Sequence, residues 1–301
     1  MRRSFFSQLA SLAEKDESLY FITADLGFGA VEGFREKFPE RFLNVGVSEQ
    51  AMLGIAAGMS TAGMKVICYS IAPFSWLRPF EFFRNGVLAS KNSVMVVGVG
   101  PGFDYTHDGI SHYCFEDLAL AQSQPNLHIA LTTYISDVES ALIEFATNPK
   151  PTYLRLPRNE PQVKEIKNIV ESPAQDDSEI LILSHGLMLD RAHNFFDTYM
   201  KMGLRASIYT INNLSNDVIK KIVNLTKNTK VLHVVEDHYT FGGSATRISE
   251  NLINHKIKII NDSVLIMPVG EVGNFSFMES KVFKDKDLII NEIKEYLLDG
   301  K

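Results

Sequence analysis

Short apolar runs rich in Val, Ile and Leu alternate with helical patterns along residues 18–158. A run that is apolar throughout, without polar alternation, indicates a strand buried on both faces, which is typical of a parallel sheet covered by helices. The expected strands are 20–24, 42–47, 65–69, 93–98, 128–131 and 152–156. We expect helices at 49–62, 80–90, 116–123 and 135–146 between them.

A second series of the same kind follows a segment at 159–178, which is rich in charged residues, holds two prolines and shows weak periodicity. Such a composition is typical of a linker. We expect further strands at 179–184, 205–209, 230–236 and 263–267, and helices at 188–201, 216–225, 244–254 and 287–298. The sequence therefore predicts an α/β fold of two doubly wound, mostly parallel-sheet domains, 1–158 and 179–301, joined by the linker 159–178.

The overall charge and the cysteines exclude some classes of partner and location. The net charge of −6 gives no basic field for a phosphate backbone, so nucleic acid is not expected as a partner. Cys68 and Cys114 lack metal-ligand spacing and are typical of reduced core thiols. The first residues indicate an amphipathic helix and not a signal peptide, and no apolar run is long enough to span a bilayer. We therefore expect a cytoplasmic protein with no membrane partner.

Glu49 follows the strand expected at 42–47 and begins a helix rich in small residues. In one interpretation it only complements the helix dipole, which contributes about 0.3–1 kcal/mol. In the other, a carboxylate at the carboxyl end of a central strand lies where open α/β sheets bind ligands. Residues 45–58, VGVSEQAMLGIAAG, resemble the glutamate motif of the transketolase and 1-deoxyxylulose-5-phosphate synthase group. The resemblance implies that Glu49 is catalytic and shares a proton with N1′ of the thiamine aminopyrimidine, which favours the reactive imino tautomer of the cofactor.

Five large aromatic side chains crowd residues 74–83 and include the only tryptophan. Any single one of them is more often a core residue than a cofactor contact. Residues 69–85 nevertheless resemble the F-x-x-x-R-x-x-(D/E)-x-x-R-N stretch of the same group, whose members stack an aromatic ring on the pyrimidine. The resemblance implies that Phe74, Trp76 or Phe80 makes this stack, a choice that the sequence leaves open. It also implies that Arg78 belongs to the cofactor site.

The loop and strand ends at 98–126 and 151–161 carry the expected substrate residues. The first stretch resembles the D-G-x-T-H-Q-x-x-E-D-L-A…P-N motif, which implies that Asp108 and His112 bind substrate hydroxyls and that His112 takes part in catalysis. Tyr113 departs from the usual Gln or His, which puts the identity of the substrate in doubt. Arg158 matches the position of a substrate-binding arginine in transketolases, and its fork suits a phosphate or another anionic group. For Arg155, a solvated or ion-paired arginine is at least as good an interpretation.

Two further stretches resemble the same family. Residues 23–27 resemble its A-D-L segment, which implies that Asp25 and Leu26 line the cofactor cleft, although a turn explains these residues equally well. Residues 234–244 resemble its E-x-H-x-x-x-G-G motif, in which the glycines allow a close turn onto a helix. We interpret this second motif as structural.

The sequence contains no G-D-G…N motif of the kind with which full-length transketolases hold Mg²⁺ and diphosphate through oxygen ligands. The resemblance therefore implies that thiamine diphosphate and its Mg²⁺ are held mainly by a separate N-terminal subunit, in a heterotetramer, and that the chain alone forms a homodimer. The implied activity is the transfer of a two-carbon ketol unit from a ketose or ketose phosphate to an aldose. Two alternatives remain open: the β subunit of a 2-oxo-acid dehydrogenase, and a non-catalytic regulatory homologue.

Overall fold

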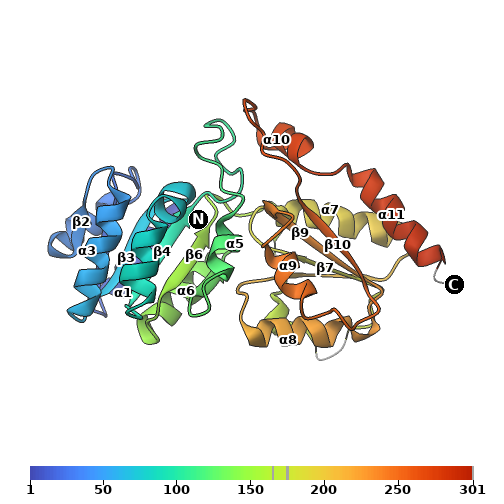
Figure 1. The fold of residues 1–301 in the computed structure, drawn as a ribbon, viewed down its shortest axis with the longest axis horizontal. Coiled ribbons are helices and arrows are strands. Elements are labelled where there is room, and N and C mark those ends of the chain that lie inside the picture. The colour runs from blue at the N-terminus through green and yellow to red at the C-terminus, as the bar shows by residue number, and fades with distance from the viewer. Residues whose placement is uncertain (165, 174–175, 300–301) are drawn as a thin grey trace. The chain divides into compact units, whose positions relative to one another are not determined.

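The computed structural model describes residues 1–164, 166–173 and 176–299. Residues 165 and 174–175 of the predicted linker and the last two residues of the second predicted domain lie outside the described residues. Two compact units are present, one made of residues 1–105 and 111–160 and the other of 106–110 and the residues from 161 onward. In each unit helices pack on a parallel sheet (Figure 1), which confirms the predicted fold class.

The sheet of the first unit contains six parallel strands in the order β2-β1-β3-β4-β6-β5. They are β1 (Leu19–Thr23), β2 (Phe42–Asn44), β3 (Lys65–Ile71), β4 (Val94–Val99), β5 (His128–Leu131) and β6 (Thr152–Leu156). The inner strands β3, β4 and β6 are almost completely buried, as their continuous apolar runs predict. The chain order reverses between β1 and β3, and open α/β sheets bind ligands at the carboxyl ends of strands at such a switch point.

β2 differs from the prediction, because it has only three residues and pairs only with β1 at the edge of the sheet. The chain leaves the sheet after Asn44, whose side-chain oxygen accepts the N–H of Gly46, a glycine with φ of 70°. Val47 is consequently 74% exposed. The expectation that Glu49 follows a buried central strand is therefore wrong, although Glu49 still lies at the carboxyl edge of the sheet.

Three helices of the first unit form one apolar core with the sheet. α1 (Arg2–Ala13), α2 (Glu32–Lys37) and α6 (Ile135–Thr147) share this core on one face, with contributions from Phe5, Leu9, Phe34, Val138 and Phe145. α3 (Glu49–Thr61) packs on β3, and α5 (Asp117–Gln122) packs on the π-helical turn η2 (Pro73–Leu77). Ser48 precedes α3 without a side-chain capping bond.

The segment predicted as one helix at 80–90 is broken. It consists of the short helix α4 (Phe80–Phe82) and the π-helical turn η3 (Phe83–Leu88), and another π-helical turn, η2 (Pro73–Leu77), comes before them. Pro79 separates η2 from α4, and proline interrupts a regular helix because it has no N–H to donate. Wide π-helical turns are frequent at functional sites.

The sheet of the second unit contains four parallel strands in the order β10-β9-β7-β8. The strands are β7 (Ile180–Ser184), β8 (Ala206–Thr210), β9 (Val231–Tyr239) and β10 (Lys258–Val264), and the helices are α7 (Met188–Lys201), α8 (Asn216–Leu225), α9 (Ser244–Ser249), α10 (Phe275–Val282) and α11 (Lys286–Asp299). The strand expected at 263–267 is wrong in position, because Leu265 and Ile266 leave the sheet and are exposed. α10 was not predicted. In the part of the chain that the structure describes, no helix is both long and apolar enough to cross a bilayer.

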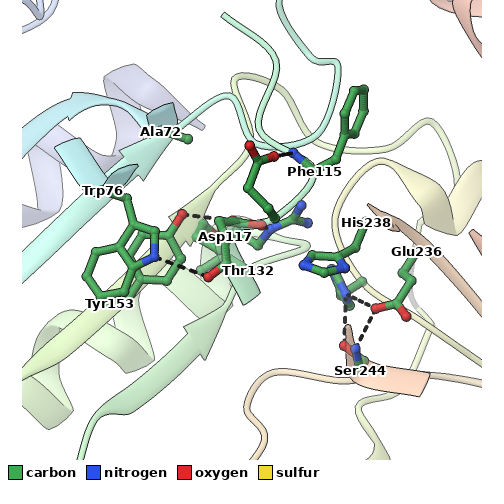
Figure 2. Close-up of polar contacts among 12 residues, drawn as sticks. Ala72, Trp76, Phe115, Asp117, Thr132, Tyr153, Glu236, His238 and Ser244 are labelled. Atoms are coloured by element: carbon green, nitrogen blue, oxygen red, sulfur yellow. Dashed lines mark hydrogen bonds and ion pairs between the residues drawn. The ribbon is translucent and has the colours of Figure 1, made fainter. Parts of the chain in front are cut away.

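The N-terminus of α9 is capped by the carboxylate of Glu236, which is fully buried. Its oxygens accept the N–H of Ser244 at 2.6 Å (Figure 2) and the N–H of Ala245 at 3.1 Å. Burial opposes ionisation of this carboxyl, but the hydrogen bond from His185 and the positive charge of nearby histidines hold its pKa below the usual value. A Cβ atom at Gly243 would lie 2.7 Å from Cδ of Glu236, so only glycine fits at this position. The motif at 234–244 thus closes α9 onto β9.

Gly243→Ala should lower the stability of the second unit by about 1–3 kcal/mol, since the added methyl overlaps the capping carboxylate. Thermal unfolding followed by circular dichroism measures this loss. Gly33→Ala is the matched control, because its Cβ would meet open space in α2, where alanine favours the helix over glycine by up to about 1 kcal/mol. A Gly243→Ala variant as stable as the parent chain would contradict the close approach to Glu236.

Candidate active site

Glu49, the first residue of α3, is 1% exposed and pairs with Arg78. Its Oε2 accepts a hydrogen bond from Nη1 of Arg78 at 2.6 Å, and the Arg78 side chain is 39% exposed. Arg78 comes directly after η2, so the π-helical turn that follows β3 brings the cation to the carboxylate. The guanidinium supplies the counter-charge that a buried carboxylate requires.

Aromatic contacts continue from Arg78 to His112. The guanidinium carbon of Arg78 lies 4.5 Å from the centre of the Phe74 ring. The same ring meets the imidazole of His112 edge to face, with 5.1 Å between ring centroids. Ser111 Oγ lies 2.9 Å from Nδ1 of His112. Four predicted site residues, Glu49, Arg78, Phe74 and His112, therefore form one row of contacts.

Trp76 and Phe80 lie away from this row. Trp76 is completely buried; its ring stacks on Tyr153 at 4.4 Å, and its Nε1–H donates to the backbone oxygen of Asp117 at 3.1 Å (Figure 2). Phe80 packs edge to face against Trp76 at 5.6 Å. Of the three rings between which the sequence left a choice, Phe74 is the one in contact with both Arg78 and His112.

A buried ion pair fixes the helix that follows the His112 loop. Oδ2 of Asp117 accepts a hydrogen bond from the Tyr153 hydroxyl at 2.8 Å (Figure 2). It accepts a second one from Nε of Arg155, also at 2.8 Å. Arg155 is only 2% exposed and pairs with a carboxylate that is fully buried. The interpretation of Arg155 as an ion-paired arginine is therefore correct, and this side chain stabilises the core.

Asp25 and Leu26 lie at the carboxyl end of β1, beside the end of β2. The N–H of Asp25 donates to Oδ1 of Asn44 at 2.9 Å, and the amide of Asn44 donates back to Asp25 at 3.2 Å. The N–H of Leu26 donates to the Thr23 hydroxyl at 3.3 Å. Asp25 has a φ of 56°, a left-handed conformation that aspartate tolerates better than most residues. The predicted turn thus describes the local structure of these residues. The turn lies at the switch point of the sheet.

Arg158 follows β6 and lines a cavity of about 420 Å³ in the first unit. The other lining residues include Arg2, Arg3, Phe28, Gly29 and Ala30. Nη2 of Arg2 donates to the backbone oxygen of Phe28 at 2.7 Å, which holds this arginine against the cavity wall. Three arginines at one cavity favour an anionic ligand. Sequence reasoning missed Arg2 and Arg3, whose only signal was that two adjacent arginines begin an amphipathic helix.

Asp108 belongs to the segment 106–110, which groups with the second unit. There the N–H of Gly273 donates to the backbone oxygen of Thr106 at 3.2 Å. Asp108 is exposed, and Gly109 after it has a φ of 76°, as expected for a turn. Within residues 1–164, 166–173 and 176–299, no cluster of three or more His, Cys, Asp or Glu side chains is arranged to hold a metal ion.

Comparison with known proteins gives matches over most of the chain. Residues 1–163 match the model of the transketolase pyrimidine-binding domain, and residues 172–287 match that of the transketolase C-terminal domain. A putative transketolase C-terminal section of Methanocaldococcus jannaschii is 30% identical over 94% of this chain and 90% of its own length. An apulose-4-phosphate transketolase subunit of Phocaeicola vulgatus is 24% identical over 86% of this chain and 85% of its own. A solved structure described as a split gene transketolase, inactive beta4 tetramer, superposes with a TM-score of 0.77 at 25% identity, covering 89% of this chain and 90% of that one.

Proposed function

The chain belongs to the transketolase family, and we propose that it is one subunit of a two-chain, thiamine-diphosphate-dependent transketolase. In the proposed reaction a two-carbon ketol unit moves from a ketose or ketose phosphate to an aldose. The observation that carries the proposal is the row of contacts from Glu49 through Arg78 and Phe74 to His112. This row brings a buried carboxylate, an aromatic ring and an imidazole close together.

The residues of this row fit the aminopyrimidine end of thiamine diphosphate. A flat heteroaromatic ring gains from stacking on Phe74, and a ring nitrogen gains from the buried carboxyl of Glu49. Asp25 and Leu26, at the switch point of the sheet, would line the same cleft. When bound, thiamine diphosphate supplies a carbon centre that stabilises a carbanion. Glu49 would hold a proton at N1′ and so keep the 4′-amino group in its basic form.

His112 and Arg158 would act on the substrate. The imidazole of His112 is half-buried and would hydrogen-bond a substrate hydroxyl and move its proton. Asp108 would bind a further hydroxyl. Arg158, with Arg2 and Arg3, would hold the anionic end of a sugar in the cavity of about 420 Å³. The name of the Phocaeicola relative, a transketolase for apulose 4-phosphate, supports a phosphorylated sugar as the class of substrate.

The proposed assembly contains a second kind of chain. One relative is named as a C-terminal section and another as a single subunit of its enzyme, and the similar solved structure is described as a split gene product. These descriptions support a separate N-terminal subunit that would hold the diphosphate and Mg²⁺, in a heterotetramer of two copies of each chain. Alone, this chain would associate with itself. Cys68 and Cys114 are buried and form no disulfide, which supports the proposal of a reduced, cytoplasmic protein.

Arg158→Ala should raise KM for a phosphorylated aldose by about 10–100-fold, because a hydrogen bond to a charged group contributes about 1.5–3 kcal/mol. The affinity for thiamine diphosphate and kcat should change little. Steady-state kinetics of the assembled enzyme give KM and kcat with a phosphorylated acceptor and with its unphosphorylated counterpart. His112→Ala is the matched comparison and should lower kcat with both acceptors. Loss of thiamine diphosphate affinity in Arg158→Ala would overturn the assignment of Arg158 to the substrate.

A further inference from the structure

Tyr105 contacts both Arg158, which lines the cavity, and His112, which belongs to the row of contacts. The guanidinium carbon of Arg158 lies 4.4 Å from the centre of the Tyr105 ring. The ring also lies beside the imidazole of His112, with 5.8 Å between centroids. The ring lies directly against Gly100, which has a φ of 66° and at which a Cβ atom would collide with the tyrosine ring. Gly100 therefore allows Tyr105 to lie where it does.

The contacts of Tyr105 restrict how Arg158 can point. A guanidinium over an aromatic face gains about 0.5–2 kcal/mol, which favours this position of the Arg158 side chain. The backbone N–H of Arg158 also donates to Oδ2 of Asp104 at 2.7 Å. Two adjacent loop residues thus hold the backbone and the side chain of Arg158. An arginine held in this way loses less side-chain entropy when its fork binds an anion.

We propose that Tyr105 is a positioning residue that gives this site its preference for anionic sugars, by holding the guanidinium of Arg158 toward the cavity at a fixed place beside His112. The proposal rests on the proposed function and extends it to a residue outside the motifs on which that function stands. A substrate would react at His112 and bind through its anionic group at Arg158, with the Tyr105 ring between the two ends. Neutral sugars would gain nothing from this arrangement.

Three variants distinguish the contributions of the Tyr105 ring, of its hydroxyl and of its position. Tyr105→Leu removes the ring, Tyr105→Phe keeps it, and Gly100→Ala displaces it without changing any atom of Tyr105. In the assembled enzyme, Tyr105→Leu and Gly100→Ala should raise KM for a phosphorylated acceptor by about 3–30-fold, the range of a lost cation–π contact. Their kcat and their KM for the unphosphorylated acceptor should stay within about twofold of the parent. Tyr105→Phe should restore the parent KM.

Two outcomes would overturn the proposal. One is a Tyr105→Phe variant as impaired as Tyr105→Leu, which would show that the hydroxyl and not the stacked ring is required. The other is an equal loss with both acceptors, which would show a general structural role. Gly33→Ala serves as the unrelated control, and Tyr105→Met replaces the leucine variant if that variant does not fold, as judged by thermal unfolding.

Titration of the chain with inorganic phosphate, followed by calorimetry at low ionic strength, tests Tyr105 without any catalysis. Phosphate should bind about 3–30-fold more weakly to Tyr105→Leu than to the parent and to Tyr105→Phe. If this pattern is found but the parent chain transfers no ketol unit with its partner, the proposed function fails and the role of Tyr105 stands. If ketol transfer is found but Tyr105→Leu binds phosphate like the parent, the role of Tyr105 fails alone.

Discussion

Glu49→Gln should slow hydrogen–deuterium exchange at C2 of the thiazolium in the assembled enzyme by about 10²–10⁴-fold, the usual contribution of a positioned acid or base. Glutamine has the same size, and its carbonyl oxygen can still accept the N–H of Arg78, which now lies 2.6 Å from Oε2. The change therefore leaves the geometry of the site in place. It removes only the ability to share a proton with the pyrimidine nitrogen.

Rapid quenching in deuterated buffer, with the remaining C2 proton read by NMR, gives this exchange rate directly. Asp217→Asn is the matched control, because Asp217 is also an acid in the first turn of a helix, α8, but is exposed. It should lose only the helix-dipole contribution of about 0.3–1 kcal/mol in stability and leave the exchange unchanged. Near-normal exchange in a saturated Glu49→Gln enzyme would mean that Glu49, too, only complements a helix dipole.

The buried strands and the start of α3 could be predicted because their signals are local. The runs at β3, β4 and β6 are mostly apolar and are buried at nearly every position, as in a sheet covered on both faces. The run at 42–47 is also mostly apolar but lies at a sheet edge. Since edge and centre are defined by partners distant in sequence, composition did not separate the two cases.

Within the site, the sequence predicted which residue types are present. It did not always show which of two similar, nearby residues belongs to the site. Phe74 and Trp76 are two residues apart and both aromatic, yet Tyr153 and Asp117, from distant segments, bury Trp76. Arg155 and Arg158 likewise follow one strand, and only the fold shows that Arg155 pairs with Asp117. Arg2 and Tyr105 reach Arg158 across long stretches of chain, so no local motif could have marked them.

Thiamine diphosphate should bind tightly only when this chain is mixed with a partner that carries a G-D-G…N motif. The pyrimidine end of the cofactor would meet Glu49 and Phe74 here, whereas the diphosphate needs Mg²⁺ held by oxygen ligands, which we expect on the partner. Mixing should therefore strengthen Mg²⁺-dependent binding by at least about 100-fold, or about 2.7 kcal/mol, and ketol transfer should appear with it. A mixture that contains the Glu49→Gln variant should assemble in the same way but exchange the C2 proton of the thiazolium slowly.

Calorimetric titration of the lone chain with thiamine diphosphate and Mg²⁺ is the most direct test of the split-enzyme account. We expect no binding at micromolar concentrations by the chain alone, and tight binding together with ketol transfer once the partner is added. Micromolar, Mg²⁺-dependent binding by the lone chain, or ketol transfer without any partner, would contradict it.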